Sequence, residues 1–208
     1  MTTPVHILLA LTKDGLARYD EGTEAKGRRA NIGHGITRTQ VEALAVALER
    51  HGYIVKEVEP ALLGRDGWHP GRRQYHSKSL LKMAREKAKA LTDWHAKVLL
   101  MTDADIYDTD TVFVAGQAEV NGRAAVMSLA RLGAADETRF MRRVLKETVH
   151  ELGHTLGLGH CRENDCVMFP SRALADSDIK DHELCKRCRT KAGRALAPDR
   201  QTIMFPRP

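Results

Sequence analysis

Hydrophobic and polar residues follow one another along the first half of the chain in a way that predicts strands and helices in turn. Residues 5–11 and 96–102 are apolar runs of strand length, and residues 53–58 also have strand character. Residues 41–48 and 77–91 instead place their apolar side chains at helical spacing, with polar residues on the other face. We therefore expect strands and helices that alternate along the chain.

Short-range signals mark the ends of these elements. Thr39 and Glu42 have the spacing of a capping box, which predicts that the first helix begins there, and Gly52 would end it. The segment 60–76 is rich in glycine and proline, so we expect it to be a loop.

The second half begins with a hairpin signal and continues with a long helix. Asn121-Gly122 separates two strand-like arms, residues 111–119 and 123–129, and is typical of a tight β-hairpin. The helix begins near Thr138 and has an apolar stripe that can pack on a core. The stripe consists of Met141, Val144, Leu145, Thr148, Val149 and Leu152, and the opposite side carries Arg143, Lys146, Glu147, His150 and His154.

Together these elements predict an α/β (α+β) fold with a mixed, twisted β-sheet and helices. We expect residues 1–137 to form a sheet-and-helix subdomain. Residues 138–208 would hold the long helix and a smaller C-terminal subdomain, all within one compact domain.

The composition fits this single domain and narrows the class of partner. The chain has 208 residues, 42% of them hydrophobic, and no apolar run near the length that a membrane helix needs. The net charge of +6 would suit nucleic acid, but 33 basic residues are offset by 27 acidic ones and only 5% are aromatic. The N-terminus lacks a signal-peptide pattern. We expect a cytoplasmic monomer that acts on a peptide or protein, without a membrane or nucleic-acid partner.

Candidate chemistry is concentrated in residues 150–160, which read H-E-x-x-H-x-x-G-x-x-H. On a helix, His150 and His154 project from one face and can bind one ion, while Glu151 can reach a water on that ion. Gly157 can adopt a positive φ and turn the chain so that His160 reaches the same ion. Three ligands leave the fourth position of a zinc ion open, which is typical of a catalytic site.

The four cysteines of the chain follow at once, in two close pairs: Cys161, Cys166, Cys185 and Cys188. Such pairs around a longer loop are typical of four thiolates on a structural zinc, and the basic neighbours favour thiolates. Two disulfides or free, redox-active thiols are the alternatives, although disulfides need an oxidising compartment. Because Cys161 follows His160 directly, the second zinc would hold the third histidine in place.

These motifs resemble the archaemetzincin family, metzincin-clan zinc metallopeptidase-like proteins with a second, four-cysteine zinc site. The similarity is close over about residues 145–188. It implies a metzincin-like domain whose active-site helix borders a cleft, with a zinc-stapled C-terminal subdomain. It also implies that Met168 lies beneath the catalytic metal. Met204 begins a second Met-Phe-Pro and is the alternative, but the short tether to Cys166 favours Met168. The arm around Phe113 is implied as the edge strand for an extended peptide.

The sequence therefore predicts a zinc metallopeptidase with two Zn²⁺ per chain, one catalytic and one structural. A zinc-bound water activated by Glu151 would hydrolyse peptide bonds, and we expect an aminopeptidase-like action on short peptides. The alternative is a zinc-stabilised, non-catalytic protein that binds a peptide or nucleic acid. It would use every metal ligand but would have no need of Glu151.

Overall fold

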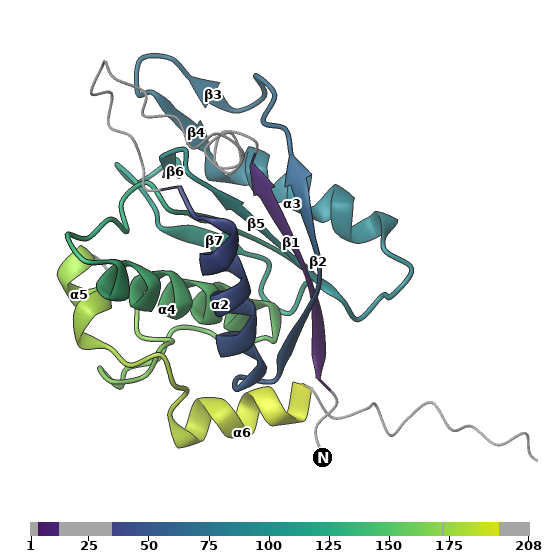
Figure 1. Ribbon diagram of the computed structural model, residues 1–208, viewed down its shortest axis with the longest axis vertical. Helices are drawn as coiled ribbons and strands as arrows, with labels where there is room; N and C mark the ends of the chain where they lie inside the picture. The colour runs from purple at the N-terminus through teal and green to yellow at the C-terminus, as the bar shows by residue number, and fades with distance from the viewer. Residues whose placement is uncertain (1–3, 13–34, 172, 196–208) are drawn as a thin grey trace, which may run out of the picture.

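The computed structural model describes residues 4–12, 35–171 and 173–195, and these build a central sheet with helices on both faces (Figure 1). The sheet has the strand order β2-β1-β5-β8-β7, in which only β7 runs antiparallel to its neighbour. Its strands are β1 (Val5–Thr12), β2 (Tyr53–Ala61), β5 (Lys97–Thr102), β7 (Gly116–Ala118) and β8 (Ala124–Ser128). The expected mixed α/β architecture is therefore confirmed.

Alternate residues of the central strands supply two separate cores. In β1, Ile7 and Leu9 face one side of the sheet, where α2 (Arg38–Glu49) and α4 (Glu137–Thr155) cover it. Leu8 faces the other side, where α3 (Ser77–Ala90) packs. This period of two is what a strand that is buried on both faces requires. The first core also includes Cys161, Cys166 and Cys188, so it extends into the C-terminal segment.

The two remaining helices of the described ranges belong to that C-terminal segment. They are α5 (Leu174–Ile179) and α6 (Lys186–Ala195), and α5 lies against one end of α4 (Figure 1). No helix within the described ranges is long and apolar enough to span a bilayer. The division of the chain at residue 137 stays a prediction.

Three local expectations were wrong. Helix α2 begins two residues earlier than the capping signal implied, because Thr37 caps it and exchanges hydrogen bonds with Gln40. The segment 60–76 is not only a loop, since it contains β3 (Trp68–His69) and β4 (Gln74–His76), which join β6 (Ile106–Tyr107) in a second small sheet. The first hairpin arm, expected over residues 111–119, forms a strand only over the three residues of β7. The expected turn is present, and Asn121 in it has the positive φ of 57° that a tight hairpin turn favours.

Candidate active site

Helix α4 carries most of the candidate site, and its end is shaped by a glycine. Asp136 caps the start of the helix by accepting a hydrogen bond from the Arg139 N–H at 2.8 Å. At the other end Gly157 has a φ of 81°. Its N–H donates to the His154 carbonyl at 2.9 Å, and the next N–H, of Leu158, donates to the Gly153 carbonyl at 3.1 Å. These two bonds form a Schellman motif, which reverses the chain toward His160.

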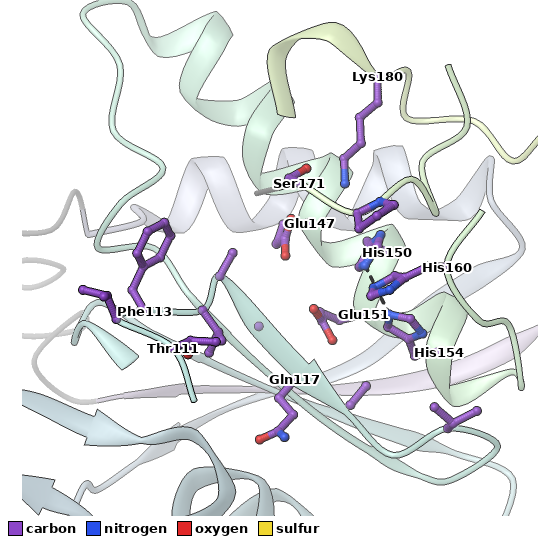
Figure 2. A pocket seen from close by; sticks show the side chains of 17 residues that line it. Thr111, Phe113, Gln117, Glu147, His150, Glu151, His154, His160, Ser171 and Lys180 are labelled. Carbon is purple, nitrogen blue, oxygen red and sulfur yellow. Dashed lines mark hydrogen bonds between the residues drawn. The ribbon is translucent and has the colours of Figure 1, made fainter. Parts of the chain in front are cut away.

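The three histidines of the motif converge at one point (Figure 2), and one nitrogen of each lies within 4.8 Å of the others. His150 Nδ1 lies 2.8 Å from the carbonyl oxygen of Val167, and His154 Nδ1 lies 2.8 Å from that of Leu158. A carbonyl oxygen only accepts, so each Nδ1 carries the hydrogen and each Nε2 carries a lone pair.

These facing lone pairs fit a metal cation. The Nε2 atoms of His150 and His154 are 3.1 Å apart. Two neutral imidazoles cannot share a hydrogen bond in these tautomers, whereas a cation between them would bind both. Burial lowers the pKa of all three imidazoles, most strongly that of His150, which keeps them in the neutral form that binds metal. The donor set of three nitrogens suits zinc and leaves a coordination position open.

Glu151 lies beside the histidines and is buried, with its Oε2 lacking a hydrogen-bond partner among the described residues. Glu147, one helical turn earlier, is also buried and acts on Glu151 through its charge. Burial raises the pKa of both carboxyl groups, and the charge of Glu147 raises that of Glu151 further. A divalent cation held by the histidines would offset this cost, so the buried carboxyl pair also fits a metal site.

A cleft of about 580 Å³ opens in front of these residues. One wall is formed by residues 111–118, which include the edge strand β7, and Phe113 is among them. Gly116 of β7 faces Glu151 so closely that a Cβ atom there would lie 2.5 Å from Glu151 Oε1. The free edge of a β-strand along a cleft is a surface on which an extended peptide can bind.

Lys180 lines the same cleft, although only 1% of its surface is exposed. It follows α5 and reaches in from that side, in the direction of Glu147 (Figure 2). Its Nζ donates a hydrogen bond to the Phe169 carbonyl at 3.2 Å. Burial lowers the pKa of this ammonium group, while the charges of Glu147 and Glu151 act in the opposite direction. The interior of the site therefore holds a cation opposite two carboxyl groups.

Arg143 and Lys146, which share the polar side of α4 with the histidines, do not line the cleft. Arg143 is buried and pairs with Asp178 of α5 through two hydrogen bonds of 2.7 and 2.6 Å. Lys146 is also buried, and its Nζ donates to the Ser177 carbonyl at 2.9 Å. Both side chains hold α5 against α4, and through it they fix the segment that carries Lys180.

Met168 lies directly under the metal-binding turn of α4. It is fully buried, and its Sδ would be 2.5 Å from a Cβ atom at Gly153, so the helix and the methionine touch because residue 153 has no side chain. The Met168 carbonyl accepts a hydrogen bond of 2.8 Å from the Cys161 N–H. The rival Met204 lies outside the described residues.

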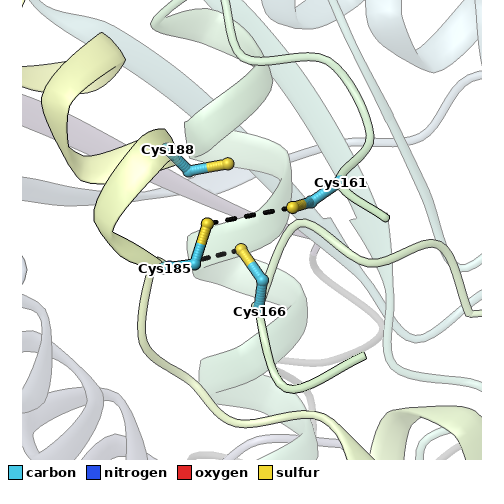
Figure 3. Close-up of side chains that lie close together, drawn as sticks. All are labelled: Cys161, Cys166, Cys185 and Cys188. Atoms are coloured by element: carbon cyan, nitrogen blue, oxygen red, sulfur yellow. Dashed lines mark hydrogen bonds between the residues drawn. The ribbon is translucent and has the colours of Figure 1, made fainter. Parts of the chain in front are cut away.

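The four cysteine sulfurs gather behind this turn (Figure 3), all within 4.8 Å of one another. The thiols are free, so the disulfide alternative is not found. Cys161 Sγ and Cys185 Sγ are 3.8 Å apart. Four sulfurs at about 2.3 Å from a central zinc would be separated by roughly 3.8 Å, so the cluster fits that ion. Burial alone would raise the pKa of Cys161, but hydrogen bonds from the Glu163 N–H and Arg187 outweigh it and lower this pKa to about 7.

The sequence prediction did not include three residues of this site. Glu147 had a signal, because it lies four residues before Glu151 on the helix face that carries the histidines. Gly116 and Lys180 had none, since the first depends on how β7 lies against α4 and the second on where α5 places its end.

The comparisons with known proteins agree with this geometry. The model of peptidase family M54 matches residues 71–194. An archaemetzincin from Methanopyrus kandleri is 39% identical over 137 residues, which cover 66% of this chain and 76% of that protein. One from Archaeoglobus fulgidus is 42% identical over 125 residues, or 60% of this chain and 72% of that protein.

Solved structures give the same result. The crystal structure of the Methanopyrus kandleri archaemetzincin matches with a TM-score of 0.73 at 29% identity, covering 94% of this chain and 97% of that one. That of the Archaeoglobus fulgidus archaemetzincin, complexed with malonate, matches with a TM-score of 0.70 at 30% identity, covering 90% and 99%.

The fold and the matched family define the class as a zinc metallopeptidase. The chain belongs to peptidase family M54, the archaemetzincins. The resemblance noted in the sequence and the metzincin-like fold that it implied are both confirmed.

Proposed function

We propose that this archaemetzincin hydrolyses peptide bonds with a water that Glu151 activates beside a catalytic zinc, and that a second zinc is structural. The single observation that carries the proposal is the pair of Nε2 lone pairs that face each other at 3.1 Å. They lie next to the buried Oε2 of Glu151, which has no hydrogen-bond partner within the described part of the chain. The catalytic zinc would be held by His150, His154 and His160, and the structural zinc by Cys161, Cys166, Cys185 and Cys188.

Each side chain then has a separate task. When bound, the catalytic zinc supplies a Lewis acid that polarises the scissile carbonyl and brings the pKa of water to about 7. Glu151 accepts the proton of the attacking water and delivers it to the leaving amine. The charge of Glu147 raises the pKa of Glu151 and so makes it a stronger base, and Lys180 balances the charge of the pair.

The structural zinc would position the third histidine. Cys161 is the next residue after His160, and its backbone is tied to Met168 beneath α4. A metal on the four thiolates would restrict this short segment and so place the His160 ring, which stacks on His150 with ring centroids 5.3 Å apart. Met168 would support the turn from below. The described part of residues 138–208 would thereby act as a subdomain organised by two metals.

The substrate would be a short peptide bound along β7 and cut in an aminopeptidase-like manner. Glu147 and Glu151 are the carboxyl groups in the lining of this cleft, and Glu147 is free of any zinc-binding role. It is therefore the group that can pair with a free α-ammonium. Lys180 could pair with a C-terminal carboxylate instead, but its Nζ already donates to the Phe169 carbonyl.

The experiment is a mass-spectrometric digest of a peptide library by the zinc-loaded protein and by its Glu151→Ala variant. We expect cleavage by the first and none by the second, with equal zinc content in both. Cleavage by the pure variant would contradict the assignment of the base. No cleavage by either protein, with two zinc ions bound, would instead favour the non-catalytic binding protein.

A second digest tests the end preference with matched peptides that have free or acetylated N-termini. An aminopeptidase-like enzyme would cut only the free form, and the Glu147→Gln variant would lose this preference. Equal cutting of both forms would show that the enzyme acts internally or from the C-terminus.

A further inference from the structure

Outside the two clusters already described, a third group of metal-binding side chains gathers at the junction of α2 and the C-terminal segment. His51 follows the end of α2, while His182 and Glu183 lie in the connection between α5 and α6. One donor atom of each lies within 4.8 Å of the others. The histidines of the active site meet the same limit.

Neighbouring groups orient these donors. His182 Nδ1 lies 2.7 Å from Asp181 Oδ1, and this carboxylate can only accept, so His182 Nε2 carries the lone pair. That Nε2 faces Glu183 Oε1 at 3.7 Å. Arg189 donates to the other oxygen of Glu183 at 3.3 Å, which holds the carboxylate while Oε1 faces His182. A carboxylate behind the histidine and a cation behind the glutamate are the kind of outer partners that hold metal ligands in place.

We propose that His51, His182 and Glu183 form a third metal site, for a divalent transition-metal ion such as zinc. Two imidazoles and one carboxylate suit such an ion, whereas calcium and magnesium prefer oxygen alone. His51 meets His182 edge-on, with ring centroids 5.4 Å apart. Both histidines are half-buried and Glu183 is exposed, so an ion can enter from solvent and keep a water as its remaining ligand.

An ion here would clamp the C-terminal segment onto α2. The Glu183 carbonyl accepts a hydrogen bond of 2.9 Å from the Val167 N–H, and Cys185 follows two residues later. The third ion would therefore link α2, which packs on the sheet, to the connection that carries Cys185 and leads to Cys188 in α6. Its occupancy would stabilise the packing of that connection without contacting the cleft.

The test is a zinc titration of the full-length protein followed in the histidine ring spectrum by NMR. After the higher-affinity sites are filled, further zinc should shift the ring signals of His51 and His182 and leave those of His95, an exposed histidine beside Trp94, unchanged. No shift of His51 and His182 at saturating zinc would overturn the proposal.

Metal content provides the second measurement. At saturating zinc, the His51→Ala and His182→Ala variants should each bind one zinc fewer than the parent protein, and the His95→Ala control should bind the same number. Unchanged zinc content in either site variant would also overturn the proposal. Neither readout depends on peptidase activity.

Discussion

Gly116 and Glu151 touch across the cleft: a Cβ atom at position 116 would lie 2.5 Å from Glu151 Oε1. The general base proposed here therefore occupies the space that a glycine leaves on the edge strand. This contact fixes how closely β7, the strand that would bind the peptide, approaches α4, the helix that carries the histidines.

Replacing Gly116 by Ala should therefore displace the Glu151 carboxyl group without removing a metal ligand. A displacement of about 1 Å at a reacting group costs on the order of 100-fold in rate. We expect kcat/KM to fall by this order while the zinc content stays the same. Gly64→Ala is the matched control, because a Cβ atom there meets nothing within 4 Å. Full activity of Gly116→Ala would show that the contact does not position Glu151.

A second prediction concerns the turn at Gly157. Gly157 and Gly52 both have a φ of 81° and both follow the end of a helix, but only Gly157 precedes the third histidine. Replacement by Ala should destabilise the fold by about 1 kcal/mol at either position, because a side chain strains this conformation. Only Gly157→Ala should also weaken binding of the catalytic zinc. Thermal unfolding and competition with a chelator measure the two effects, and equal affinity for the catalytic zinc in the two variants would contradict this account.

The cysteine cluster gives a third prediction. Cys188→Ser should lose one zinc and much stability, since a structural zinc site contributes directly to folding. Activity should fall with it, because the turn that holds His160 would loosen. Metal analysis beside Glu151→Ala, which should bind as many zinc ions as the parent protein, separates the two kinds of variant. A Cys188→Ser protein that bound as many zinc ions as the parent would rule out the four-thiolate assignment.

A fourth prediction concerns pH and the Arg143–Asp178 pair. The hydrogen bonds from Arg143 lower the pKa of Asp178 below its ordinary value. The stabilisation is therefore present above the ordinary pKa of an aspartate, about 4, and is lost as the pH falls through the lowered value. Asp178 is 37% exposed, so solvent screens the pair. We expect Asp178→Asn to cost about 1 kcal/mol at neutral pH.

Urea unfolding of Asp178→Asn and the parent protein at several pH values checks this. The difference in unfolding free energy should narrow as the pH falls toward about 3. Asp66→Asn, a change at an exposed aspartate, serves as the control and should show no such trend. A difference that grew in acid would have the wrong sign for a carboxylate of lowered pKa.

The parts of the site that the sequence could predict are local in the chain. His150, His154 and His160 lie within eleven residues, and helical spacing with one glycine turn is enough to bring them together. The four cysteines are also close in the sequence, within residues 161–188. The burial of β1 and β5 on both faces also follows from their apolar runs.

The parts that it could not predict depend on tertiary packing. Arg143 and Lys146 had the pattern of a polar helix face, and their partners on α5 are more than thirty residues away. Gly116 and Lys180 reach the cleft only through the placement of β7 and α5. The sequence offers two capping boxes, Thr37 with Gln40 and Thr39 with Glu42, and the prediction used the second. In the structure Thr37 is the N-cap of α2.

The most direct test of the account is anomalous diffraction at the zinc absorption edge from crystals of the zinc-loaded protein. We predict one peak about 2.1 Å from a nitrogen of each of His150, His154 and His160, with the Glu151 carboxyl group beside it, and a second about 2.3 Å from the four cysteine sulfurs. An ion bound by Glu151 in place of one of these histidines, or no peak at the histidines in an active preparation, would contradict the central claim.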